Sequence, residues 1–148
     1  MSAVSDRTVA YVIAAQPVFE DLRQVTAQLA GLLVLAATGS KDASPHHPML
    51  ESAKLVCVRA LDDVNRLGTL TSGQTRAHHR RLLDAGAAIT DAVASADSWP
   101  IDVDAVMTPL RTAYGHLQSA SMLLPGFQIV SFEQACCGYR NDDQRGAR

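Results

Sequence analysis

The spacing of the apolar residues constrains this chain most, because they recur every three or four positions over most of its length. In an α-helix that spacing places apolar side chains on one face, so each such segment predicts a helix that buries one stripe. Glycines, prolines and polar turns divide the pattern into four segments. We therefore predict helices over about residues 17–38, 48–67, 73–97 and 102–124.

Proline and aspartate mark where the predicted helices begin. Pro17 and Pro48 suit a first helical turn, where a backbone N–H would have no hydrogen-bond acceptor within the helix. Asp102 is a candidate N-cap, and Pro109 should either kink the last helix or mark its true start after a Thr108 cap. Short connections favour antiparallel neighbours, so the predicted fold is an all-α, up-down four-helix-bundle-like single domain.

Two segments that flank the four helices are rich in β-branched and aromatic residues. Thr8–Ala15 and Phe127–Glu133 would pair as a small ribbon or continue as helices, and we expect a helix for the first. A chain of 148 residues favours one domain with a substantial core. We place this helical domain at residues 1–140, followed by a flexible tail at residues 141–148.

Charge, hydropathy and cysteine count limit the expected partners. The net charge of −2 removes the attraction that supplies most nucleic-acid affinity, so we expect no nucleic-acid partner. The longest apolar run, Leu29–Ala37, is about half of the roughly 20 residues that a membrane span needs, so we expect no membrane partner. Three cysteines without framework spacing favour a reducing compartment, and we expect a cytoplasmic protein.

One segment of the first predicted helix, Leu32–Ala37, is apolar on every side. A four-helix bundle buries only one stripe of each helix, so this segment needs a further cover. Either the flanking segments or a second copy of the chain would supply it. We predict a homodimer.

Another segment, MTPLRTAYGHL at Met107–Leu117, resembles the dimerisation helix of sensor histidine kinases. The resemblance consists of Thr108 and Pro109, followed by Gly115 six residues after the proline. That family places its phosphorylated histidine four residues before the threonine, where this chain has Asp104. The resemblance implies a helical dimer with a proline kink, and it carries no phosphotransfer activity to this chain.

Helix register places one set of metal-binding residue types at the same height in the predicted bundle. With turns near residues 70 and 100 and a rise of about 1.5 Å per residue, Cys57, Asp84 and His116 share one layer. His79 lies about 7 Å away along the axis. Such a cluster suits a soft divalent transition-metal ion. The alternative is no cofactor, with a buried thiol that packs as a small apolar residue beside a hydrogen-bonded histidine.

Two histidine pairs, His46–His47 and His78–His79, do not suit a shared metal ion. Neighbouring side chains on a helix point about 100° apart, and the two pairs differ in height by roughly 20 Å. We expect His46 and His47 near a helix start, and His78 and His79 partly exposed.

The adjacent cysteines Cys136 and Cys137 do not suit a shared metal ion either. Their side chains would point to opposite faces of a strand or about 100° apart on a helix. A disulfide between neighbours would strain the bond geometry. Either one cysteine packs inward, or the pair is redox-sensitive or forms an intermolecular bridge.

The basic residues Arg76, Arg80 and Arg81 form a candidate site for an anion or a partner. Free backbone N–H groups collect near the amino end of a helix and would support such binding. Asp62 and Asp63 fall at the same height on the neighbouring predicted helix, so a salt-bridge network between the two helices is the alternative.

The chain has no recognisable catalytic motif: it lacks Glu-x-x-His pairs, a Gly-rich phosphate loop, a G-x-S-x-G elbow and H-E-x-x-H. We therefore expect a non-enzymatic interaction or regulatory module with a protein partner. The alternative is a metal-binding or thiol-redox-responsive helical protein that uses Cys57 with His116, or Cys136 with Cys137. A third option is an apolar pocket for a small ligand between the helices.

Overall fold

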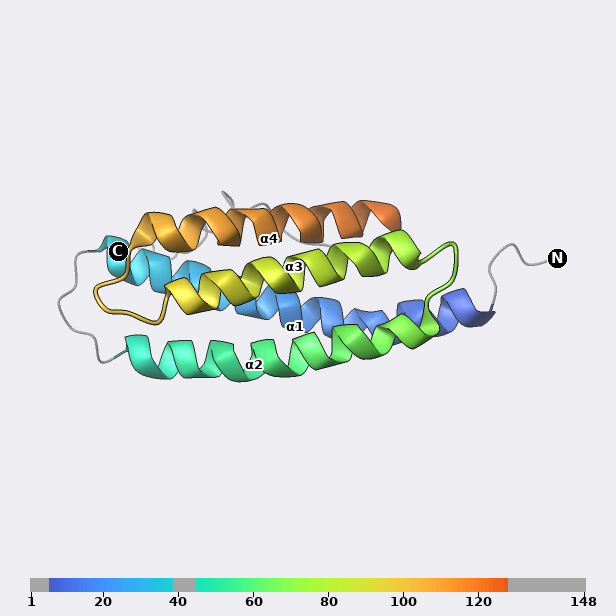
Figure 1. Cartoon of the computed structure of the whole chain (residues 1–148), viewed down its shortest axis with the longest axis horizontal. Helices are drawn as coiled ribbons and strands as arrows, with labels where there is room; N and C mark the ends of the chain where they lie inside the picture. The colour runs from blue at the N-terminus through green and yellow to red at the C-terminus, as the bar shows by residue number, and fades with distance from the viewer. Residues whose placement is uncertain (1–5, 39–44, 128–148) are drawn as a thin grey trace, which may run out of the picture.

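Helices account for nearly all of the described chain. The computed structural model describes residues 6–38 and 45–127. Its elements are α1 (Asp6–Ala37), α2 (His46–Leu67), the short 3-10 helix η1 (Gly68–Leu70), α3 (Arg76–Ser95) and α4 (Val103–Leu123). The helices lie side by side and alternate in direction (Figure 1), which confirms the predicted four-helix-bundle-like fold. No helix in residues 6–38 or 45–127 is long and apolar enough to cross a bilayer.

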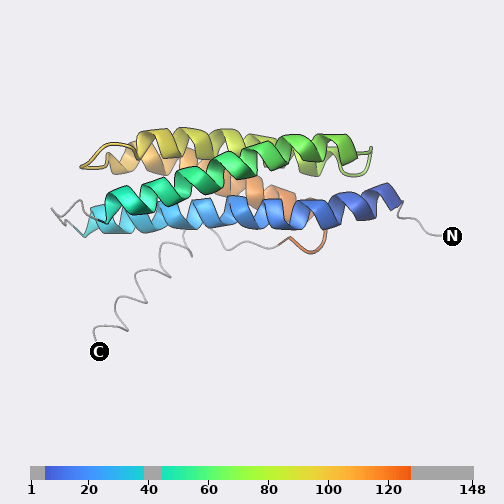
Figure 2. The ribbon, with the colours of Figure 1, turned by 90° about the horizontal axis from the view of Figure 1, so that it is seen from below.

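The bundle consists of two closely packed helix pairs. α1 packs mainly on α2, and α3 packs mainly on α4. Seen from below, the α1–α2 pair lies beside the α3–α4 pair (Figure 2). Gly86 allows one close approach between the pairs, because a Cβ at this position would lie only 2.6 Å from Cδ2 of Leu61 on α2.

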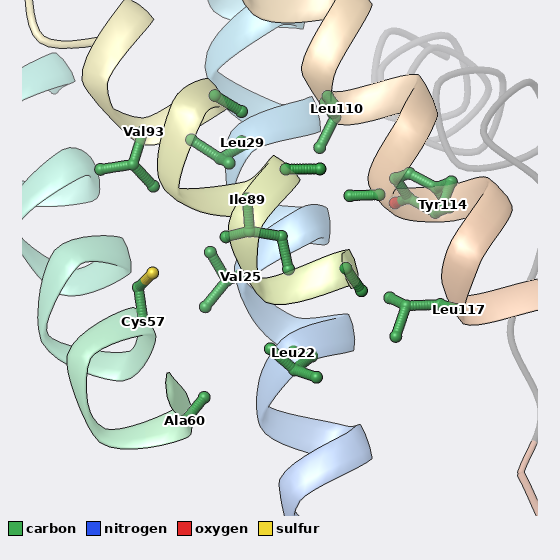
Figure 3. Close-up of a cluster of buried hydrophobic side chains, with 14 of the residues drawn as sticks. Leu22, Val25, Leu29, Cys57, Ala60, Ile89, Val93, Leu110, Tyr114 and Leu117 are labelled. Carbon is green, nitrogen blue, oxygen red and sulfur yellow. The ribbon is translucent and has the colours of Figure 1, made fainter. Parts of the chain in front are cut away.

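Small and medium apolar side chains from all four helices fill the core. Figure 3 shows them converging between the helices. The labelled residues are Leu22, Val25 and Leu29 on α1, Cys57 and Ala60 on α2, Ile89 and Val93 on α3, and Leu110, Tyr114 and Leu117 on α4. All ten are buried. Alanine at many core positions lets the helix axes approach closely.

α1 begins at Asp6, eleven residues before its predicted start, and passes through Pro17. The helix expected at Thr8–Ala15 is confirmed, and the placement of Pro17 in a first turn is wrong. A proline inside a helix costs about 3 kcal/mol. Burial of a large side chain contributes about 1.5–3 kcal/mol, and Tyr11 and Phe19 are buried on either side of the proline. Tertiary packing therefore outweighs the proline.

α4 begins as the sequence predicts. The Asp102 carboxylate accepts a hydrogen bond from the backbone N–H of Ala105 at 3.3 Å, which confirms the N-cap. Pro109 lies inside the helix, and the Thr108 hydroxyl donates back to the Asp104 carbonyl oxygen at 3.2 Å. The alternative start after a Thr108 cap is therefore wrong.

α2 begins at His46, so Pro48 lies in its first turn as predicted. The tail at residues 141–148 and all but the first residue of Phe127–Glu133 lie outside the described residues.

Candidate functional site

The most deeply buried histidine is His78 on α3, whose side chain is only 1% exposed. The Tyr11 hydroxyl on α1 lies 2.7 Å from Nδ1 of His78, and the two rings meet edge to face with centroids 5.5 Å apart. The expectation that His78 is partly exposed is wrong. His78 lies four residues before the buried Leu82, on the same stripe of α3, and this register was the sequence signal for its burial.

The protonation states of this pair follow from its burial. Burial, with a smaller contribution from the charge of His79, lowers the pKa of His78 to about 4. Burial also raises the pKa of the Tyr11 hydroxyl above its ordinary value. Both groups are therefore neutral at pH 7. We assign the tyrosine hydroxyl as the donor to Nδ1 of His78, because the reverse arrangement would leave the buried hydroxyl proton without an acceptor among the described residues. The remaining imidazole proton is then on Nε2.

Nε2 of His78 is a buried donor without an acceptor among the described residues. An unsatisfied buried donor costs about 1–3 kcal/mol. The pair is therefore held in place by the packing around it rather than by a complete hydrogen-bond network.

A short segment after α4, Leu124–Phe127, packs on His78 through the ring of Phe127, and we call it the strap. The Phe127 side chain is 2% exposed, and its ring centroid lies 4.4 Å from that of His78 and 5.2 Å from that of Phe19. Gly126 has a φ of +92°, which favours glycine, and its carbonyl oxygen accepts a hydrogen bond from Gln16 at 3.2 Å.

Burial of the Phe127 ring favours the closed strap. Burial of a phenylalanine side chain contributes about 1.5–3 kcal/mol to closure.

The start of α1 is tied to the connection between α2 and α3, which fixes Tyr11 beside His78. Arg7 donates to the carbonyl oxygens of Thr69 at 3.1 Å and Leu70 at 3.4 Å. The Thr8 hydroxyl donates to the Gln74 side-chain oxygen at 2.8 Å. These contacts join segments that are more than sixty residues apart in the sequence.

The four residues of the predicted metal layer each have a different partner or environment. Cys57 is buried, which raises the pKa of its thiol, although a hydrogen bond with Thr90 opposes the shift. His79 donates from Nε2 to the Val64 carbonyl oxygen at 2.8 Å.

The other two predicted ligands interact with arginines. Arg81 donates to Nδ1 of His116 at 3.3 Å, and Asp84 lies 3.7 Å from Arg80 in an ion pair. Within residues 6–38 and 45–127, no three His, Cys, Asp or Glu side chains are placed to hold one metal ion. Cys136 and Cys137 lie outside the described residues.

The basic residues Arg76, Arg80 and Arg81 are exposed at the start of α3. The salt bridges between these arginines and Asp62 or Asp63, the alternative to an anion site, do not occur among the described residues. Asp62 pairs instead with Arg66 of its own helix at 2.8 Å. Ion pairs between helices lie elsewhere. Arg59 on α2 pairs with Asp21 on α1, and Lys54 pairs with Asp97 just after α3.

The remaining histidine pair lies at the start of α2, as expected. His46 is buried, and its Nε2 donates to the Ala96 carbonyl oxygen at 2.8 Å. Its ring lies 5.1 Å from that of Trp99. His46 therefore connects α2 to the end of α3.

The surface carries several large apolar side chains. Leu55 and Val58 on α2 are 73% and 69% exposed. The others are Val9 and Ile13 on α1, and Met122 and Leu123 on α4. Exposed apolar groups that are adjacent on one face are typical of interaction surfaces.

Comparison with known proteins places this chain in no family. No protein-family model matches it, and neither does any curated protein or solved structure. Its function is therefore inferred from the geometry of the described residues alone.

Proposed function

We propose that this chain is a non-enzymatic, cytoplasmic helical interaction module that acts as a homodimer, with the outer face of α2 as its contact surface. The observation that carries the proposal is the exposure of Leu55 and Val58, two large apolar side chains one helical turn apart. The cytoplasmic location is supported by an odd number of cysteines without framework spacing.

α2 has two apolar faces, whereas a helix at the edge of a bundle needs only one. Its buried stripe consists of Leu50, Ala53, Cys57, Ala60 and Val64. At 100° per residue, Leu55 and Val58 lie on the opposite side of the helix. A helix that covers only its own core carries polar residues there, so the second apolar face favours a partner.

Charged residues border this outer apolar face. Glu51 and Asp62 continue the line of Leu55 and Val58 at either end, and both are exposed. Arg59 lies beside Val58 and pairs with Asp21 on α1. An apolar centre with a polar rim is the usual composition of a protein–protein contact.

The apolar segment at the end of α1 adds less support for the dimer. Leu32 and Leu33 are buried within the single chain. Val34, Leu35 and Ala36 are half-buried. The chain therefore covers much of this segment itself, and the outer face of α2 is the stronger reason to propose a second copy.

Binding rather than catalysis is also supported by the state of two groups in the described chain. Burial raises the pKa of the Cys57 thiol, which disfavours the nucleophilic thiolate. His78 is neutral beneath the strap and has no access to solvent. Neither group is placed to act on a substrate.

Light scattering on a sizing column tests the proposal. The wild-type chain should elute with the mass of two chains, and Leu55→Glu/Val58→Glu should elute with the mass of one and an unchanged helical circular-dichroism spectrum. The matched control is Met122→Glu, because Met122 is 86% exposed on α4, and this variant should stay dimeric. A monomeric wild type at all concentrations would contradict the proposal.

A further inference from the structure

The strap contacts the Tyr11–His78 pair through the ring of Phe127, which lies against the imidazole. Phe127 packs directly on His78, while Tyr11 occupies Nδ1 and leaves Nε2 without an acceptor among the described residues. A single side-chain hydrogen bond, from Gln16 to the Gly126 carbonyl oxygen, holds the backbone of the strap to α1 among these residues. The closed strap therefore lies on a buried imidazole whose Nε2 has no acceptor among the described residues.

We propose that the strap is a latch over His78, and that acid opens it while the four helices stay folded. This device is independent of the dimer contact, which lies on the outer face of α2. It gives the module a regulated segment, because opening exposes Phe19 and His78, the two rings on which Phe127 packs.

Protonation of His78 is incompatible with the closed strap for two reasons. An imidazolium carries a proton on both nitrogens, so Nδ1 can no longer accept from the Tyr11 hydroxyl. Its second N–H and its charge would be buried without an acceptor among the described residues. When the strap opens, water reaches both nitrogens, and the pKa of the imidazole returns toward its ordinary value of about 6.5.

The direction of the pH effect follows from this difference. His78 has a lower pKa in the closed state than in the open state, so the open state binds the proton more tightly. Closure is most favourable above pH 6.5, weakens as the pH falls, and levels off below the closed-state pKa of about 4. At pH 5 the ratio of closed to open strap should be about 30-fold lower than at pH 7.5.

Few other ionisable groups of the described residues act on this site. Tyr11 on α1 keeps its proton throughout this range. His79 on α3 directs its Nε2 to the Val64 carbonyl oxygen, and Arg66 at the end of α2 pairs with Asp62 on its own helix. The strap and the last turn and a half of α4, residues 118–127, contain no ionisable side chain.

An NMR titration of the full-length chain between pH 7.5 and pH 4 tests the latch. His78 should titrate below its ordinary range, and the Phe127 ring signals should move toward exposed positions with the same midpoint. The methyl signals of Ile89, which lies in the core, should stay in place. A Phe127 ring that stays buried while His78 titrates, or the loss of Phe127 and Ile89 signals together, would overturn the proposal.

Variants of the strap provide the reciprocal test. Phe127→Ala should raise the proton affinity of His78 at least about 10-fold, because coupling between two sites acts equally in both directions. Gln16→Ala removes only the hydrogen bond to Gly126 and should raise the proton affinity of His78 about 2–10-fold. This variant keeps the test valid if Phe127→Ala does not fold. Met122→Ala, at an exposed position near the end of α4, should leave it unchanged. Equal proton affinity in the wild type and every folded strap variant would overturn the latch.

Discussion

Tyr11 on α1 and His78 on α3 meet inside the bundle, with the tyrosine hydroxyl 2.7 Å from Nδ1 of the imidazole. Both side chains are almost completely buried. The two residues are 67 positions apart in the sequence. Their bond thus fixes the alignment of α1 against α3 at one end of the bundle.

Removing the tyrosine hydroxyl should destabilise the fold measurably. Tyr11→Phe leaves Nδ1 of His78 without its hydrogen-bond donor, and we expect a loss of about 1–3 kcal/mol in the free energy of unfolding. Denaturant unfolding of Tyr11→Phe, His78→Leu and the double variant measures the coupling. The double variant should cost less than the sum of the two single variants. Additive losses would show that the two groups do not interact.

Stability should depend on pH through the same histidine. The pKa of His78 is lower in the folded state than the ordinary value expected when unfolded, so the unfolded state binds the proton more tightly. The stability that His78 contributes is complete above pH 6.5 and decreases as the pH falls toward 4. The loss stops growing once acid has opened the strap, because the open folded state then binds the proton about as tightly as the unfolded state. Denaturant unfolding between pH 7.5 and 4 measures this loss. His78→Gln, which does not titrate in this range, should show a smaller loss, and an identical pH profile would contradict the assignment.

Two glycines inside helices should respond to alanine in opposite ways. Gly115 has open space at its Cβ position, so Gly115→Ala should stabilise α4 by about 0.5–1 kcal/mol. Gly86→Ala would place a Cβ 2.6 Å from Leu61 Cδ2. We expect this contact to outweigh the gain in helix propensity, with a net loss of about 1–3 kcal/mol in the free energy of unfolding. Thermal unfolding of both variants checks the difference. In a Leu61→Ala background, Gly86→Ala should no longer destabilise the fold. Equal effects at the two glycines would contradict the close approach.

Two prolines offer a similar comparison. Pro17 lies inside α1, so Pro17→Ala restores an N–H for the Ile13 carbonyl and should stabilise the fold by about 1–3 kcal/mol. Pro48 lies in the first turn of α2, where an N–H has no partner in the helix, so Pro48→Ala should change stability by less than about 0.5 kcal/mol. Denaturant midpoints compare the two variants. A destabilised Pro17→Ala variant would mean that the proline shapes α1 in a way that the packing needs.

The sequence was sufficient for the helices because their apolar stripes are long and regular. It was insufficient at the start of α1, where the local signal of Pro17 favours a helix start but the burial of Tyr11 and Phe19 decides the structure. Local propensity contains no information about such tertiary contacts.

The candidate site shows a second limit of sequence reasoning. Counting residues from each turn estimates height along the bundle, but it does not give the direction of a side chain around its helix. Cys57 and His116 were predicted at one height, but Cys57 points into the core, whereas His116 contacts Arg81 near the surface. The buried pair of Tyr11 and His78 was within reach of the sequence, because each lies in the register of its own buried stripe.

The central claim is that the outer face of α2 joins two copies of this chain, and amide NMR spectra across a dilution series test it most directly. On dilution, the signals that shift should cluster around Leu55 and Val58, while those around Met122 on α4 should stay constant. The Leu55→Glu/Val58→Glu variant should show the diluted spectrum at every concentration. Spectra of the wild type that do not change with concentration, or changes centred on another face, would contradict the account.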